Sequence, residues 1–488
     1  MSFPKSPVKG NTLLYAALSL TVLIIFSFSF FFETIPYHDG AGFDGTFYQE
    51  VFRSFSTDFF STGYDSFRIQ RIFPFCLLHY VYKAFSIPLD NIHMTMGVML
   101  AQLINLLLQL FLFFRLAKLQ QWKTATTTIL FALFFYNFGT LKNCGYDPYQ
   151  TDSFAVTIAL GAYYLLLQKK WALSYAVSLL GLITWPIIPA INALLILFHT
   201  QPATTNTPNK LGPFIYRYSP LAYLLAVAGI VMALTVANKA HVFEILLMAE
   251  PTPWCVTLSL AVMFILLKVL FSKASPFPWS IKQLLSTFSF KRAILLAIPI
   301  VAIKVVLWFH TNNEFFFDGK LFLLQTLIRP LKYPAITLAG HVAYWGILPL
   351  LILVFFRNFS QKFTNTSPGH ALAFLALALF ALDSEARHIA TFIPLILVAL
   401  GDVLDEMHLG ARKVATLVAL QLFLSHFYIP INGEGMALAL ENEDFSTFPA
   451  QMLLMNFGAW MTPETYIFWI IAALGTLLAL LKLLKPAE

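Results

Sequence analysis

The side chains with the clearest potential for chemistry lie between positions 37 and 48. This stretch reads Tyr-His-Asp-Gly-Ala-Gly-Phe-Asp-Gly-Thr-Phe-Tyr and includes Asp39, Asp44 and Tyr48. Three glycines within six residues let the backbone turn sharply and come close to a ligand. A carboxylate beside apolar surface suits a general base near neutral pH, which makes Asp44 the candidate base. The alternative is that Asp44 caps a short helix beginning near Thr46.

A second polar group follows, with Arg68, Gln70 and Arg71 just before Pro74. Arginine forks match phosphate oxygens, so two arginines at lipid headgroup level could hold a lipid-linked phosphate. Ordinary headgroup anchoring is the alternative. Residues 72–87 predict an apolar helix that lies flat on the outer surface, with His79 and Lys83 on one face.

Two further sites carry acids and bases. Asp152 opens a predicted helix, where the helix dipole alone would also favour a carboxylate. Residues 383–388 read Asp-Ser-Glu-Ala-Arg-His and form a short outer link between two predicted spans. The link brings Glu385, Arg387 and His388 to the bilayer surface, where they could form an interfacial charge pair.

Two lysines are weaker candidates for a functional role. Lys332 stands among prolines and a tyrosine in the predicted loop 310–341. This loop could cover a bound lipid, although mixtures of basic and aromatic residues are common at membrane interfaces. Lys304 falls within a predicted span, about 8 Å from its outer end at 1.5 Å per residue. We expect it to snorkel to the interface.

The composition decides the class of protein that must position these residues. The chain has 488 residues, of which 58% are hydrophobic and 11% charged. Soluble domains carry ~25% charged residues. A soluble enzyme, a disordered chain and a nucleic-acid binder are therefore excluded. Three cysteines make no disulfide or zinc framework.

The hydrophobic pattern predicts an all-α, polytopic transmembrane bundle. A crossing needs ~20 mostly apolar residues. Residues 171–198 form one apolar run broken at Trp185-Pro186, which predicts a helical hairpin from the cytoplasmic face. The twelve expected spans lie at about 13–32, 92–114, 123–140, 152–168, 219–237, 254–272, 293–309, 342–356, 370–382, 389–404, 413–428 and 464–482.

Charge distribution predicts the orientation. With both termini in the cytoplasm, 20 of the 31 basic residues fall inside and 20 of the 24 acids fall outside. The basic bias follows the positive-inside rule. We expect residues 1–488 to form one integral membrane domain, with extracytoplasmic loops at 33–91, 310–341 and 429–463.

The two motifs of loop 33–91 resemble a known family. Asp-Gly-Thr-Phe-Tyr at 44–48, followed by Arg-Ile-Gln-Arg-Ile-Phe-Pro at 68–74, is similar to the first-loop pattern of bacterial polytopic membrane glycosyltransferases of the GT-C superfamily. The match covers about 39–80. Residues 385–388 also resemble a Glu-x-Arg-[Tyr/His] segment seen in several of its families.

The resemblance implies an inverting transferase that moves a sugar from a polyprenyl phosphate to an acceptor on the extracytoplasmic face. Asp44 would be the base, with Asp39 and Asp152 as further catalytic candidates. Arg68, Arg71, Arg387 and His388 would bind the donor phosphate. The substrate-binding candidates are Tyr48, Gln70, Glu385 and Lys332.

The resemblance leaves several properties open. Many relatives carry closely paired acids that ligate a metal, whereas Asp39 and Asp44 are five residues apart, so use of Mg²⁺ or Mn²⁺ is open. The acceptor is a glycan, a lipid or a protein. The expected partners are the lipid donor and the bilayer, with no nucleic acid. A bacterial inner membrane is expected, with a cell-envelope glycan as product and a mannosyltransferase-like activity.

Other functions fit the same composition. A transporter or flippase for a lipid-linked sugar would carry polar sites near the midplane and repeated halves. No repeated halves are evident, and the predicted spans are almost free of charge. A polymerase or lipid-modifying transferase of another fold, and a structural membrane subunit, remain as alternatives.

Overall fold

The structure is a computed structural model that describes residues 12–199, 211–236, 247, 252–273, 279–312, 319–454 and 457–484. Over these residues the chain forms helices, turns and two isolated β-bridges, with no sheet. The predicted all-α class is confirmed. The N-terminal lysines Lys5 and Lys9, most of the connection 199–218 and parts of the segments 273–292 and 310–341 lie outside the described residues.

Several helices are long and apolar enough to cross a membrane, so the chain is a multi-pass helical membrane protein. Among the described residues five helices qualify alone, and a sixth span results if the bent pair Thr124–Phe135 and Gly139–Tyr146, with an angle of 53°, counts as one. The twelve crossings stay a prediction. The five single helices cover Asn91–Gln120, Pro253–Ser272, Phe290–Phe309, Ala386–Glu406 and Pro463–Leu483. Shorter apolar helices cover Thr12–Phe28, Asp152–Leu167, Trp171–Ile183, Ile187–Leu197, Tyr218–Met232, Phe322–Leu331 and Pro368–Phe380.

One expected span differs from the structure. Residues 342–356 do not form a single helix, because α16 (Ile336–Trp345) ends at Gly346, whose φ is +64°. α17 (Leu348–Val354) then restarts with Pro349 in its first turn. Glycine adopts a positive φ readily, and proline is tolerated at a helix start, so the pair separates two helices.

The chain divides into two compact units, each built from several segments. Unit 1 comprises Met1–Ala193, Ala293–Phe316 and Ala390–Asp444, and unit 2 comprises Leu194–Arg292, Phe317–Ile389 and Phe445–Glu488. The single membrane domain expected from the sequence stays a prediction. Most of unit 1 consists of α1 (Thr12–Phe32), α2 (Gly45–Asp58), η1 (Arg68–Arg71), α3 (Phe75–Ala84), α4 (Asn91–Gln120), α5 (Thr124–Phe135), η2 (Gly139–Asn143), α6 (Cys144–Tyr146), α7 (Asp152–Leu167), α8 (Trp171–Leu179), η3 (Leu180–Ile183), α14 (Phe290–Phe309), α20 (Ile393–Glu406), α21 (Ala411–Ser425) and α22 (Gly433–Glu441).

Unit 2 pairs its helices locally, with α10 against α12, α18 against α19, and α16 against α24. α9 (Ile187–Leu197), the beginning of α14 and η5 (Ala386–Phe392) cross the boundaries between the units. The other elements of unit 2 are α10 (Leu211–Val236), α12 (Pro253–Lys273), α13 (Ile281–Thr287), α15 (Gly319–Ile328), η4 (Arg329–Leu331), α16, α17, α18 (Phe356–Asn365), α19 (Pro368–Phe380), α23 (Ala450–Leu454), η6 (Gly458–Trp460) and α24 (Pro463–Leu483).

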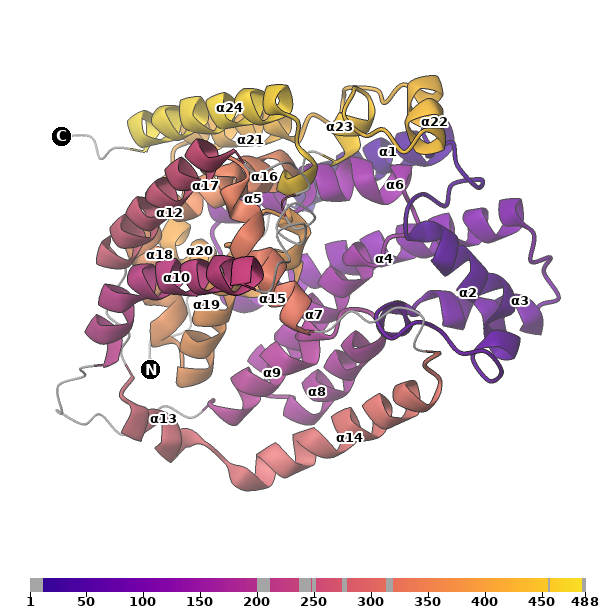
Figure 1. Cartoon of the computed structure of the whole chain (residues 1–488), viewed down its shortest axis with the longest axis horizontal. Helices are drawn as coiled ribbons and strands as arrows, with labels where there is room; N and C mark the ends of the chain where they lie inside the picture. The colour runs from indigo at the N-terminus through magenta and orange to yellow at the C-terminus, as the bar shows by residue number, and fades with distance from the viewer. Residues whose placement is uncertain are drawn as a thin grey trace. The chain divides into compact units, whose positions relative to one another are not determined.

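The first loop, residues 33–91, folds as a small helical layer within unit 1. α2 and α3 pack side by side (Figure 1). His79 and Lys83 both contact the Ser56 hydroxyl of α2, at 2.9 and 2.8 Å, which confirms that they share a face. At ten residues α3 is shorter than the ~20 that a crossing needs. Its orientation along the membrane surface stays a prediction.

Polar side chains fix α7 against α4. Asn105 donates a hydrogen bond to the Ser153 hydroxyl at 2.7 Å, and Gln109 donates to the Ser153 main-chain oxygen at 3.0 Å. One turn earlier, Gln102 donates to the main-chain oxygen of Pro148 at 2.8 Å. Hydrogen bonds of this kind, from amide side chains to a neighbouring helix, hold apolar helices in one register. They place Asp152, the first residue of α7, in a buried position beside α4.

The predicted break in the apolar run 171–198 is confirmed. α8 and η3 reach Ile183, and α9 begins at Ile187, directly after Trp185-Pro186. Phe73 of the first loop donates a main-chain hydrogen bond to Ile183 at 2.8 Å. The broken hairpin therefore supports the arginine-bearing segment η1.

Candidate functional site

The first loop turns through four residues with positive φ. His38, Asp39 and Phe43 have φ of 42°, 55° and 50°, and Gly40 has φ of 102°. Such angles are costly for residues with a side chain and cluster at functional sites. A Cβ on Gly40 would lie 2.9 Å from the methyl group of Thr95. The glycine-rich stretch thus makes the sharp turn that its composition predicted, packed closely against α4.

Asp39 ties this turn to neighbouring helices. Its carboxylate accepts a hydrogen bond from Asn91 Nδ2 at 2.9 Å, and its main-chain oxygen accepts one from the Thr95 hydroxyl at 2.6 Å. Asn91 Oδ1 in turn accepts from Arg53 of α2 at 2.5 Å. These contacts give Asp39 an architectural role, and its catalytic role stays a prediction.

Asp44 faces an arginine instead of capping the helix that it precedes. α2 begins at Gly45, where the capping alternative placed a helix, but the Asp44 side chain makes no capping hydrogen bond. Its Oδ1 lies 3.2 Å from Nη2 of Arg68. The two side chains are 38% and 42% exposed, so a ligand can reach both.

Asp65, which sequence reasoning did not single out, fixes Arg68 from the other side. Its Oδ1 accepts main-chain hydrogen bonds from Phe67 and Arg68 at 3.0 and 2.7 Å, and its Oδ2 lies 3.9 Å from the Arg68 guanidinium. Aspartate side chains commonly bond the main chain two residues on in this way and so favour turns. Asp65 is buried, so η1 starts from a fixed anchor.

Arg71 is clamped between two aromatic rings. Its guanidinium carbon lies 4.3 Å from the ring centroid of Phe67 and 4.4 Å from that of Trp185. No described carboxylate pairs with it. Stacking covers the flat faces of a guanidinium and leaves its N–H edge to bind an anion. Trp185 comes from the broken hairpin, which the sequence did not connect with this arginine.

Gln70 lies between the two arginines on η1 and is held on both sides. Its amide nitrogen donates to the main-chain oxygen of Ser66 at 2.7 Å. Its Oε1 accepts a hydrogen bond from the ammonium of Lys304 in α14. The lysine side chain therefore reaches the first loop, as expected for a snorkelling residue, and ends on a defined partner.

Tyr48 packs in the interior of the first loop. Its ring is 3% exposed and is stacked on Phe75 with a centroid distance of 4.8 Å. It belongs to a core cluster that includes Val51, Phe52 and Ile69. The structure thus gives Tyr48 a packing role, and the expected contact with substrate stays a prediction.

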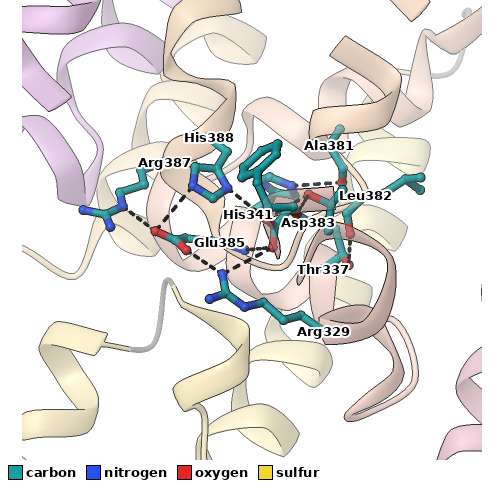
Figure 2. Close-up of polar contacts among 11 residues, drawn as sticks. Arg329, Thr337, His341, Ala381, Leu382, Asp383, Glu385, Arg387 and His388 are labelled. Atoms are coloured by element: carbon teal, nitrogen blue, oxygen red, sulfur yellow. Dashed lines mark hydrogen bonds and ion pairs between the residues drawn. The ribbon is translucent and has the colours of Figure 1, made fainter. Parts of the chain in front are cut away.

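Unit 2 holds a second polar cluster, centred on Glu385 (Figure 2). The Glu385 carboxylate accepts hydrogen bonds from Arg329 at 2.6 Å and Arg387 at 2.5 Å, and it lies 3.6 Å from His388 Nε2. Fully buried Asp383 lies 2.9 Å from Nδ1 of His388 and 3.9 Å from Arg329.

The acids of this cluster are surrounded by basic side chains. Burial alone would raise the pKa of Glu385, but His388, Arg387 and Arg329 together hold it well below its usual range. Two acids thus face two arginines, and both donor-binding candidates, Arg387 and His388, contact these acids. Arg329 is the member that sequence reasoning did not place here, since nothing local links it to a glutamate 56 positions away.

Lys332 is fixed near this cluster by a main-chain contact. Its ammonium donates to the oxygen of Ala459 at 2.5 Å and lies 5.6 Å from the ring centroid of Tyr333. Burial lowers the pKa of Lys332 to about 8. An amine of this kind changes charge in a mildly alkaline range.

A buried ion pair in unit 1 was also missed. Lys142 of η2 is 1% exposed and its ammonium contacts the carboxylate of Glu33, just after α1. The pair joins α1 to the bent helix pair. The sequence showed only two charges in separate loops.

The acids and histidines do not converge on a metal site. Among the described residues there is no group of three or more His, Cys, Asp or Glu side chains that could hold a metal ion. Neither Asp152 nor Asp44 belongs to such a group among the described residues.

The predicted site residues fall into two sets. Asp39, Asp44, Tyr48, Arg68 and Arg71 lie in unit 1 with Gln70 and Asp152, while Lys332, Glu385, Arg387 and His388 lie in unit 2. No family model matches this chain, and neither a curated protein nor a solved structure matches it.

Proposed function

We propose that this membrane protein is an inverting glycosyltransferase that takes a sugar from a polyprenyl-phosphate donor on the extracytoplasmic face. The observation that carries the proposal is the accessible pair of Asp44 and Arg68, with Arg71, which pairs with no described carboxylate, three residues further on. The GT-C-like motifs at 44–48 and 68–74 agree with it, as does the helical membrane fold. The twelve-span topology belongs to the same proposal.

The reaction needs one base and one cationic site. Asp44 takes the proton of the acceptor hydroxyl while that oxygen attacks the anomeric carbon. The bond from this carbon to the phosphate oxygen breaks, and polyprenyl phosphate leaves with the electron pair. A phosphate leaving group needs charge stabilisation, which fixed cations provide.

The positions of Arg68 and Arg71 suit two different roles. In an inverting reaction the base and the leaving group lie on opposite faces of the sugar, so a sugar ring must fit between them. Arg68 touches Asp44 directly, which suits a residue that orients the base. Residues three apart on a 3-10 helix share a face and lie about 6 Å apart along the axis. Arg71 is thereby offset from the base on the same face of η1 and suits the phosphate.

The other candidates have supporting places in this proposal. Arg387 and His388 would bind phosphate only by releasing Glu385 and Asp383, which they contact in the structure. Asp39 holds the turn before Asp44 in shape. A divalent cation, Mg²⁺ or Mn²⁺, stays an open part of the proposal.

The test uses the full chain in nanodiscs with a polyprenyl-phosphate sugar and a cell-envelope glycan fraction. Release of polyprenyl phosphate, measured by mass spectrometry, together with a product of inverted anomeric configuration supports the proposal. Movement of intact donor across the bilayer without release would instead assign a flippase. Release with retained configuration would contradict the role given to Asp44.

A further inference from the structure

Two cations beside the first loop have no acidic partner among the described residues. Arg68 is compensated by carboxylates, whereas Arg71 contacts aromatic rings. Lys304 donates to the neutral amide of Gln70. This part of unit 1 therefore carries two positive charges that its own side chains do not neutralise, and such a pair is suited to an anionic ligand.

The two cations converge on one short segment. Gln70 and Arg71 are neighbours on η1, and the Gln70 amide is fixed by its bond to Ser66. Lys304 reaches this amide from α14. Because the amide is held from the loop side, the ammonium has a defined position at Gln70, the residue that precedes Arg71 in the chain.

The lysine lies on a helix whose side chains are mostly exposed. Only 6% of the α14 span is buried, and Val301, Val305 and Trp308 are among its exposed apolar residues. Such a surface on a membrane span is suited to acyl or prenyl chains. A charge within a span is costly and marks a functional position by default.

The end of α14 is fastened to the first loop. The main-chain nitrogen of Tyr64 donates to His310 at 3.0 Å, and that of Asn312 donates to Tyr64 at 3.0 Å. Lys304 lies about 8 Å below Phe309, the last residue of α14, at 1.5 Å per residue. The apolar helix thus leads directly to the two cations.

We propose that Arg71 and Lys304 together bind the phosphate of a polyprenyl phosphate that approaches along α14 within the membrane. The inference rests on the proposed function for the choice of a polyprenyl chain. Arginine supplies a planar fork for two phosphate oxygens and lysine supplies a point charge. The prenyl chain lies against the exposed apolar face of α14, and Lys304 is a binding residue for the donor and for the released lipid phosphate.

The test measures lipid binding without any transfer reaction. The full chain is placed in phosphatidylcholine nanodiscs that contain polyprenyl monophosphate, and bound lipid is measured by native mass spectrometry. Lys304→Met should weaken binding about tenfold, the range expected for a lost charge-assisted contact. Lys304→Arg should stay within about threefold of the wild type. Lys268→Met is the matched control, because Lys268 lies in the apolar helix α12, and it should change nothing.

Competition experiments distinguish binding of a lipid phosphate from binding of free phosphate. Polyprenyl alcohol should not compete, and millimolar inorganic phosphate should not displace the lipid. Wild-type binding by Lys304→Met, or displacement by inorganic phosphate, would overturn the inference. Lys304-dependent binding without any sugar transfer would uphold it while the proposed function fails. Sugar transfer by the wild type, together with lipid binding that Lys304→Met does not change, would support the proposed function and overturn the inference about Lys304.

Discussion

The Oδ1 atom of Asp44 lies 3.2 Å from the Nη2 atom of Arg68, and both side chains are more than one-third exposed. The turn at 38–43 delivers the carboxylate, and Asp65 fixes the arginine at the start of η1. An exposed ion pair in this form contributes little to folding. Its accessibility and its position between a strained turn and a fixed helix favour a role in chemistry.

Arg68→Ala should lower sugar transfer at least tenfold while changing the free energy of unfolding by about 1 kcal/mol or less. The variant loses the group that orients Asp44, and little packing is lost. Transfer rate and thermal stability in nanodiscs provide the measurement. His93→Ala is the control, because His93 forms an exposed side-chain pair with Asp90 at 2.7 Å. Equal loss of transfer in both variants would contradict a specific role for Arg68.

Arg71→Lys should raise the donor KM about tenfold, because lysine loses both the planar fork and the stacking between Phe67 and Trp185. Trp185→Leu should shift KM in the same direction by a smaller factor. Arg115→Lys is the control, since Arg115 also stacks on an aromatic ring, that of Phe111 at 5.6 Å. Donor KM values that stay at the wild-type level in Arg71→Lys would remove this arginine from the phosphate site.

The sequence predicted those parts of the molecule that depend on local pattern. Apolar length indicated α4, α12, α14 and α24, and Trp185-Pro186 indicated the broken hairpin. The first loop was predicted with its glycine turn and short helix. The two helices within 342–356 were missed because hydropathy does not register that Gly346 and Pro349 separate them.

Contacts between distant positions were beyond a single sequence. Nothing local links Arg71 to Trp185, Arg329 to Glu385, or Lys142 to Glu33, since these pairs depend on how helices pack. A general base and a helix cap were both open for Asp44. Side-chain direction, which only the fold determines, shows an ion pair with Arg68 and no capping hydrogen bond.

Glu385→Gln should destabilise the protein by about 3 kcal/mol, because it removes the charge that accepts hydrogen bonds from buried Arg329 and partly buried Arg387. The pKa of Glu385 is lowered on folding, so its contribution is fully present above the unfolded value of about 4.3 and is lost as pH falls through the folded value. Thermal unfolding from pH 7 to pH 3 provides the measurement. The difference between wild type and variant should stay constant down to about pH 4.3 and shrink in stronger acid. A difference that disappears between pH 7 and pH 5 would contradict this network.

Lys332 should make stability rise with pH in the alkaline range. Burial lowers its pKa to about 8, so between that value and the unfolded value of about 10.4 the unfolded chain binds more protons than the folded one. Stability therefore increases from pH 8 to pH 10 by this contribution. The stability of Lys332→Met, measured by thermal unfolding, should not show this increase between pH 8 and pH 10. Parallel profiles for variant and wild type would show that Lys332 has an ordinary pKa.

The most direct measurement is the rate of polyprenyl phosphate release by Asp44→Asn compared with wild type, in nanodiscs with saturating donor. Asparagine keeps the shape of the side chain but cannot accept the acceptor proton. We predict a loss of at least a thousandfold, within the range for removal of a general base, with unchanged donor binding and thermal stability. Asp39→Asn, which alters a carboxylate of the same turn, should lose far less. An Asp44→Asn protein that releases polyprenyl phosphate at the wild-type rate would contradict the account.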